Sequence, residues 1–235
     1  MEKEKNKEKI ELTILMPCLN EEANIEYCIK AALCFLHRYD ICGEILIVDN
    51  GSCDSSVQLA SALGVRVVHE PSQGYGRALR KGIHKAYGHY IIIGDCDTTY
   101  NFSNLMPFLS ALRSGSDLVV GNRFAGGIQK GAMPFSHRYI GVPILSWLGR
   151  KRYGVNVTDF HCGLRGLNRI TANTLSFTST GMEFATELIG RFASSNAKIT
   201  EIPTTLSVSR QPRKPHLKAF RDGLRHIGFM LKRLD

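Results

Sequence analysis

Short apolar runs alternate with amphipathic segments along the first half of the chain. The runs are rich in β-branched residues and are bounded by residues that favour turns, which is typical of buried strands. They predict strands at residues 10–16, 44–49, 65–69 and 90–97. Helix-start residues and apolar positions at helical spacing predict helices that begin near Asn20, Asp54 and Gly74. This order predicts an α/β fold with a parallel, doubly wound sheet.

The second half of the chain is less regular. We predict a strand at residues 117–121, a helix at 182–192, a strand at 198–202 and a basic, proline-containing loop at 208–216. Residues 1–9 form a charged tail that we expect to be disordered, and no repeat or low-complexity linker follows it. Residues 10–235 are therefore interpreted as one domain.

Two segments are candidates for contact with a membrane surface. Apolar residues recur at spacings of three and four from Leu217 to Leu234, and basic residues lie off this stripe. Such a helix either rests on an anionic membrane or packs against its own domain or a second copy. The apolar segment at residues 139–148, which is followed by Arg150, Lys151 and Arg152, is the second candidate.

Composition narrows the class of protein. The chain has 235 residues and a net charge of +9, so phosphates, nucleic acid or anionic lipid are plausible partners, although the charge also serves solubility. Seven cysteines without a C-x-x-C pair favour reduced, packed thiols in a cytosolic protein. The charged N-terminus does not have the pattern of a signal peptide, and no stretch is long enough to span a bilayer. We expect a soluble or peripheral protein.

Two carboxylates close the fourth predicted strand. Alternation along a strand would project Asp95 and Asp97 to the same side, where they repel one another unless a cation lies between them. Mg²⁺ is typically held by one or two carboxylates together with substrate phosphates, so a nucleotide diphosphate held through a metal is the first hypothesis. The alternative is a solvated loop with two acids. Residues 17–21 and 49–52 also follow strands, and ligands of such sheets bind at the carboxyl ends of the strands.

Five motifs occur in a fixed order along the chain. They are MPCLNEE at residues 16–22, VDNGSCD at 48–54, GYGRA at 74–78, DCD at 95–97 and DFHCGLR at 159–165. Together they resemble the family-2 glycosyltransferases of GT-A fold, and within them the dolichyl- or polyprenyl-phosphate sugar synthases. The resemblance implies a Rossmann-like, mostly parallel sheet flanked by helices. It also implies a nucleotide-binding half at about residues 10–125 and an acceptor half, with a C-terminal extension, at about 126–235.

The resemblance implies a role for individual residues. The nucleotide side would comprise Pro17, Asn20, Glu21, Asp49, Gly51, Gly74 and Asp95. Mg²⁺ or Mn²⁺ would be held by Asp95, Asp97 and Thr99, and the catalytic carboxylates would be Asp97 and Asp159. The acceptor phosphate would be bound by Arg123 and Arg165, for which the alternative is an ordinary surface or helix-capping arginine. Arg210 and Arg213 belong to the basic loop, which could close over the donor and acceptor phosphates as a lid; a solvated loop is the default interpretation. Glu183 would contact the sugar or the acceptor site, whereas Glu187, four residues on, is as compatible with a solvated helix face.

For Asp49, an Asx-turn at the end of a strand is a second interpretation, compatible with nucleotide binding. For the whole chain, the resemblance implies inverting, metal-dependent transfer of a sugar from a nucleotide-diphosphate sugar to a polyprenyl phosphate. We expect peripheral binding to the cytoplasmic membrane face and no nucleic-acid partner. A soluble glycan or peptide acceptor, and a non-catalytic nucleotide-sugar-binding protein, are the alternatives; a homo-oligomer or a membrane partner protein is compatible with each.

Overall fold

The computed structural model describes residues 10–211 and 219–231, with the side chains of residues 219–222 excluded. The predicted charged tail at 1–9, the candidate Arg213 and the apolar residues Leu217 and Leu234 lie outside the described residues.

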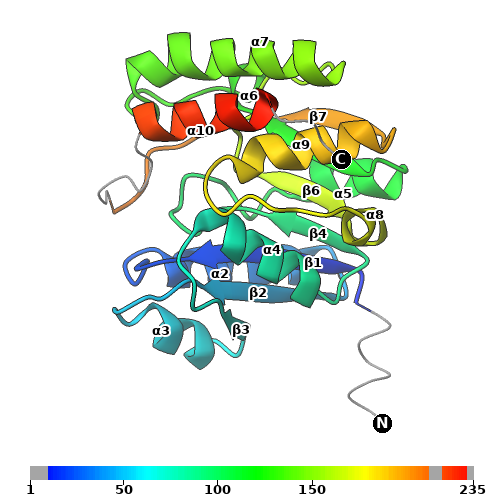
Figure 1. Cartoon of the computed structure of the whole chain (residues 1–235). Coiled ribbons are helices and arrows are strands. Elements are labelled where there is room, and N and C mark those ends of the chain that lie inside the picture. The colour runs from blue at the N-terminus through cyan, green and yellow to red at the C-terminus, as the bar shows by residue number, and fades with distance from the viewer. Residues whose placement is uncertain (1–9, 212–218, 232–235) are drawn as a thin grey trace.

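Within the described residues, seven strands form one mixed sheet (Figure 1). Their order in the sheet is β3-β2-β1-β4-β6-β5-β7. Strands β3, β2, β1 and β4 run parallel, β6 runs antiparallel to both of its neighbours, and β7 pairs in parallel with β5. The strands are β1 (Leu12–Cys18), β2 (Gly43–Asp49), β3 (Arg66–His69), β4 (Tyr90–Ile93), β5 (Leu118–Asn122), β6 (Arg165–Asn168) and β7 (Ile199–Pro203).

Helices flank this sheet. In Figure 1, α4 crosses in front of β1 and β2, and α7 and α10 lie together at the end of the molecule opposite β3. The helices are α2 (Ile25–Arg38), α3 (Ser56–Ala62), α4 (Tyr75–Lys85), α5 (Met106–Arg113), α6 (Arg123–Gly126), η2 (His137–Gly141), α7 (Val142–Tyr153), α8 (Arg169–Thr174), α9 (Phe184–Ser194) and α10 (Ala219–Leu231).

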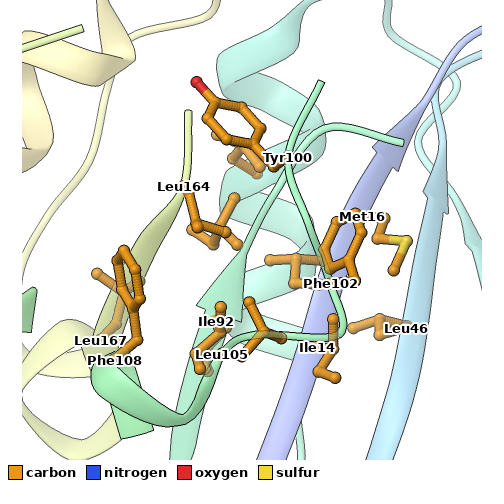
Figure 2. Packing of buried hydrophobic residues seen from close by; sticks show 14 of the residues in the cluster. Ile14, Met16, Leu46, Ile92, Tyr100, Phe102, Leu105, Phe108, Leu164 and Leu167 are labelled. Carbon is orange, nitrogen blue, oxygen red and sulfur yellow. The ribbon is translucent and has the colours of Figure 1, made fainter. Parts of the chain in front are cut away.

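The core explains the apolar runs of the sequence. Strand β1 is covered on both faces, so consecutive residues such as Ile14 and Leu15 are both fully buried. Figure 2 shows Ile14 and Ile92 packed with Phe102 and Leu105, which belong to the segment that follows β4. The four predicted strands of the first half are present, with ends shifted by a few residues. Of the seven cysteines, all free, four are buried and Cys34, Cys42 and Cys53 are exposed.

One prediction about β4 is wrong. The strand ends at Ile93, so Asp95 and Asp97 are placed by a turn and not by strand alternation. The Cα of Gly94 lies against the ring of Phe102, where an added Cβ would be 2.8 Å from that ring. Thr98 then adopts a left-handed backbone with φ of 67°. The chain therefore leaves the sheet before the two carboxylates.

Candidate active site

The loops that follow β1 and β2 are joined by short hydrogen bonds. The backbone N–H of Asn20 donates to Ser52 Oγ at 3.0 Å, and the N–H of Cys53 donates to Asn20 Oδ1 at 2.8 Å. The N–H of Glu21 donates to Ser56 Oγ at 2.8 Å. Pro17 lies within β1, directly before this pair of loops. The structure thus brings Pro17, Asn20 and Glu21 to the carboxyl end of the sheet, where a nucleotide is expected.

Asp49 ends β2 and closes the turn that follows it. Its carboxylate accepts hydrogen bonds from the N–H groups of Gly51 at 3.3 Å and Ser52 at 3.0 Å, and lies 3.1 Å from Nδ1 of His69. Burial acts to raise the pKa of Asp49, but the hydrogen bonds from Ser52, His69 and Gly51 outweigh it and hold the pKa below its ordinary value. The Asx-turn interpretation is confirmed, and nucleotide binding by Asp49 and Gly51 stays a prediction.

The glycines at the start of α4 have a structural reason. A Cβ on Gly74 would lie 2.3 Å from the carbonyl oxygen of Thr180, and a Cβ on Gly76 would lie 2.6 Å from that of Ser179. Gly74 also has a φ of +147°. The N–H of Gly76 donates to the Thr180 carbonyl at 3.1 Å. The start of α4 therefore packs directly on the turn at residues 178–181, and the role of Gly74 beside a nucleotide stays a prediction.

Asp95 and Asp97 are held by hydroxyl groups. Tyr75 Oη donates to Asp95 Oδ1 at 3.1 Å, and Thr99 Oγ1 donates to Asp97 Oδ1 at 2.6 Å. The other Asp95 oxygen lies against Gly163, where an added Cβ would be 2.5 Å from it. Tyr75 is a site residue that the sequence analysis missed.

The oxygen donors of this turn fit a hard divalent ion. Within residues 10–211 and 219–231, no cluster of three or more His, Cys, Asp or Glu side chains forms a complete metal cage. Two carboxylates and the nearby Thr99 hydroxyl would leave coordination positions for phosphate oxygens and water, which is how Mg²⁺ is usually bound beside a nucleotide.

Asp159 is fully buried and forms an ion pair with Arg123. Nε of Arg123 lies 2.7 Å from Asp159 Oδ2, and Nη2 lies 2.7 Å from Oδ1. The backbone N–H of Arg123 donates to the same carboxylate at 3.1 Å, and the N–H of Asp159 donates to Glu201 at 3.0 Å. Burial acts to lower the pKa of Arg123, but surrounding groups that include Asp159 outweigh it, so the pKa is raised.

Arg165 organises backbone carbonyls. Its guanidinium donates to the carbonyl oxygens of Phe160 at 2.6 Å, Ala185 at 2.7 Å and Cys162 at 2.8 Å. Burial lowers its pKa. Arg123 and Arg165 are both buried, so neither is an ordinary surface arginine. Their contact with an acceptor phosphate stays a prediction, and for Arg165 it would require these carbonyl contacts to change.

The segment that leads into the basic loop lies over the Asp97–Thr99 turn. The N–H of Arg210 donates to Thr98 Oγ1 at 2.8 Å, and its guanidinium stacks 4.0 Å from the ring centre of Tyr27. The N–H of Ser207 donates to the Thr99 carbonyl at 3.0 Å. The structure therefore brings Arg210 beside the Asp97–Thr99 turn, and its contact with an acceptor phosphate stays a prediction.

Two buried glutamates shape the turn at residues 178–181. Glu187 accepts from the N–H groups of Thr178 at 2.7 Å and Ser179 at 2.8 Å, and it is fully buried, so the solvated alternative is wrong. Glu183 Oε1 accepts from the N–H of Gly181 at 3.1 Å and lies 2.8 Å from Nη2 of Arg225 on α10. Burial acts to raise the pKa of Glu183, but these backbone hydrogen bonds and Arg225 hold it below its ordinary value.

An apolar surface is exposed on η2, α7 and α10. We define the α7/α10 patch by its exposed residues Tyr139, Ile140, Ile144, Trp147, Leu224, Ile227 and Leu231. Leu224, Ile227 and Leu231 belong to the predicted apolar stripe, so this part of the stripe does not pack on the domain. His226, Phe229 and Met230 face the protein instead. Among the described residues, no helix is long and apolar enough to cross a membrane.

Comparison with known proteins identifies the family. Residues 13–175 match the family model described as glycosyl transferase family 2, so the chain belongs to the family-2 glycosyltransferases. It is 37% identical over 223 residues to the low-salt glycan biosynthesis hexosyltransferase Agl6 of Haloferax volcanii, an alignment that covers 94% of this chain and 53% of the relative. The chain thus spans about half the length of Agl6.

Two further matches are a relative from the same organism and a solved structure. The chain is 30% identical over 195 residues to the dolichyl-phosphate hexose transferase of Haloferax volcanii, which covers 82% of the chain and 81% of the relative. Its fold is similar to that of the Mycobacterium tuberculosis glucosyl-3-phosphoglycerate synthase solved with Mn²⁺, UDP and phosphoglyceric acid. That match has a TM-score of 0.71 at 23% identity and covers 97% of this chain and 80% of the other. The predicted family, enzyme class and α/β fold are confirmed.

Proposed function

We propose that this glycosyltransferase moves a hexosyl group from a nucleotide-diphosphate sugar to a polyprenyl phosphate at a membrane surface. The observation that carries the donor half of the proposal is the position of the Asp95–Asp97 turn at the end of β1, where Cys96 Sγ donates to the Pro17 carbonyl at 3.1 Å. The acceptor half is supported by the named dolichyl-phosphate relative and by the exposed α7/α10 patch. We propose the nucleotide in residues 10–125 and the acceptor in 126–235.

The donor would be held at the turn after β4. Asp95 and Asp97, with Thr99, would bind Mg²⁺ or Mn²⁺ against the diphosphate, and a structural relative was solved with Mn²⁺ and UDP. When bound, the cation stabilises the negative charge that develops on the departing nucleoside diphosphate. Asn20, Glu21 and Asp49 would border the nucleotide, and Arg210 would add positive charge on the same side.

The acceptor would be positioned by the Arg123–Asp159 pair. A polyprenyl phosphate is already an anion, so its phosphate oxygen needs alignment and charge stabilisation more than deprotonation. Asp159 uses Nε and Nη2 of Arg123. Nη1 of Arg123 donates no hydrogen bond to another described residue, which leaves this group to donate to a phosphate oxygen. The phosphate then attacks the anomeric carbon, the bond to the nucleoside diphosphate breaks, and the configuration inverts.

The α7/α10 patch would place the enzyme on its lipid substrate. Aromatic and aliphatic side chains of η2, α7 and α10 are exposed, and Arg150, Lys151 and Arg152 follow on α7. In this arrangement, burial of the apolar side chains and attraction of the basic residues to anionic headgroups both contribute to the free energy of membrane binding. Peripheral association with the cytoplasmic membrane face follows as part of the proposal.

A transfer assay tests this function. A panel of nucleotide sugars is incubated with a short polyprenyl phosphate, with soluble glycan and peptide acceptors, and with Mg²⁺, Mn²⁺ or a chelator. We expect sugar transfer to the lipid that chelation and Asp97→Asn abolish. Transfer only to a soluble acceptor would overturn the lipid proposal, and nucleotide binding without turnover on any acceptor would favour a non-catalytic protein.

A further inference from the structure

We propose that Arg225 of α10 and Tyr75 of α4 are positioning residues for the metal-binding carboxylate Asp95, linked through Glu183 and the turn at residues 178–181. The inference rests on the proposed function, because its readout is metal binding at Asp95. According to this inference, α10, which carries part of the exposed α7/α10 patch, influences the donor side of the site.

The first link joins α10 to the turn. Arg225 Nη2 lies 2.8 Å from Glu183 Oε1 and 3.3 Å from Thr180 Oγ1. The same Glu183 oxygen accepts from the N–H groups of Gly181 and Thr180. Glu183 is buried, so removing the guanidinium would leave its charge without its cationic partner and would loosen the turn.

The second link joins the turn to α4. The carbonyl of Thr180 accepts from the N–H of Gly76, and the turn leaves no space for a Cβ on Gly74 or Gly76. Because backbone contacts backbone here, a displacement of the turn moves the first residues of α4. Tyr75 lies between these two glycines and is the first residue of the helix.

The third link joins α4 to the carboxylate. Tyr75 Oη donates to Asp95 Oδ1 at 3.1 Å, and Gly163 lies against Oδ2. One oxygen of Asp95 thus accepts a hydrogen bond from Tyr75, and the other occupies the space beside Gly163 that a side chain there would need. Partners of this kind orient a metal ligand and are needed for full metal affinity.

The chain offers matched controls. Arg152 also contacts α10, since its Nε donates to the Met230 carbonyl at 2.9 Å. It takes no part in the contacts that link Asp95 to Arg225. Tyr153 has a buried hydroxyl with no hydrogen-bond partner among the described residues. Arg152→Gln therefore loses an α10 contact without touching Glu183, and Tyr153→Phe removes a hydroxyl without removing a described hydrogen bond.

The test measures Mn²⁺ binding in the presence of UDP, from the electron paramagnetic resonance signal of free Mn²⁺. We expect Tyr75→Phe to weaken Mn²⁺ binding by about 10- to 100-fold, as removal of a ligand's hydrogen-bond partner typically does. Arg225→Gln should also weaken Mn²⁺ binding. The double variant should bind no more weakly than Tyr75→Phe alone, because the two residues act through one path. Arg225→Lys, which keeps the charge beside Glu183, should restore much of the affinity.

Several outcomes would overturn the proposal. Wild-type affinity in Tyr75→Phe would exclude positioning of Asp95 by Tyr75. Equal effects of Arg225→Gln and Arg152→Gln, or additive effects in the double variant, would show that α10 only contributes to general stability. Absence of Mn²⁺ binding in the wild type with UDP would refute the metal site itself and the inference with it. The proposed function would still be decided on its own by the transfer assay with the polyprenyl phosphate.

Discussion

Arg123 binds both carboxylate oxygens of Asp159 in a bidentate ion pair, with N–O distances of 2.7 Å for each of the two contacts. The pair joins the start of α6 to the segment between α7 and β6, at the boundary of the donor and acceptor halves proposed above. A buried ion pair contributes little net stability, but breaking it leaves an unpaired charge away from water. Substitution of Asp159 thus tests folding and chemistry together.

Asp159→Asn should lower the free energy of unfolding by about 3–5 kcal/mol, because Arg123 keeps its buried charge and loses its carboxylate. The double variant Asp159→Asn with Arg123→Met should recover part of this loss, because it removes the unpaired charge. Urea unfolding of the two single variants and the double variant completes the cycle. Strictly additive losses would contradict the energetic pairing, and lipid transfer by folded Asp159→Asn at the wild-type rate would refute the acceptor role.

The sequence predicted the first half of the sheet better than the second half. The parallel strands of the first half are buried on both faces, so their β-branched runs are easy to recognise. Strand β6 was missed because it has only four residues, one of them Gly and two of them polar. Helix α5 was missed although Phe108, Leu109 and Leu112 have helical spacing.

Contacts between side chains that are far apart in the sequence could not be predicted from the sequence. The hydrogen bond from Tyr75 to Asp95 joins residues 20 apart, and the ion pair of Arg123 with Asp159 joins residues 36 apart. For α10 the apolar stripe was recognised, but periodicity does not determine which side of a helix packs. The structure buries His226 and exposes Leu224, because Thr186 and His161 provide partners for the imidazole.

Gly76→Ala should destabilise the protein and weaken metal binding. An added methyl group would lie 2.6 Å from the Ser179 carbonyl and 3.0 Å from that of Gly181, so the turn at residues 178–181 must move. Overpacking of this kind typically costs about 1–3 kcal/mol. Gly228→Ala is the matched control, because among the described residues nothing beyond its chain neighbours and the backbone of its own helix lies within 4 Å of the added Cβ. Replacing Gly by Ala in a helix should stabilise it by about 0.5–1 kcal/mol. Thermal unfolding and Mn²⁺ titration measure both effects, and equal melting temperatures would contradict the packing argument.

Trp147→Ser should reduce binding to anionic vesicles. Trp147 is a 47% exposed member of the α7/α10 patch, and interfacial binding grows with the apolar area that enters the membrane. A loss of about 1.4 kcal/mol would lower the partition coefficient about 10-fold. Ile170→Ser is the control, because Ile170 is 61% exposed on α8, outside the patch. Co-sedimentation with phosphatidylglycerol vesicles checks both variants, and equal partitioning of Trp147→Ser and Ile170→Ser would refute the membrane-facing role.

His161 should make the stability of the protein depend on pH near neutrality. Its two ring nitrogens are buried without a hydrogen-bond partner among the described residues, and its ring lies 4.5 Å from that of His226. Burial lowers the pKa of His161 well below 6.5, and His226, Arg123 and Arg165 add to the shift. The folded protein therefore keeps this imidazole neutral at a pH where the unfolded chain binds a proton.

The sign of the effect follows from this difference in bound protons. As the pH falls below 6.5, the unfolded state gains a proton that the folded state does not, so the free energy of unfolding decreases. The slope contributed by one such group is at most about 1.4 kcal/mol per pH unit. Urea unfolding at pH 7.5 and 5.5 should therefore show a smaller pH dependence for His161→Phe than for the wild type, with His84→Gln on the exposed side of α4 as the control. If His161→Phe kept the full wild-type slope, the proton uptake would belong to other groups, and the buried imidazole would have no part in the acid sensitivity of this fold.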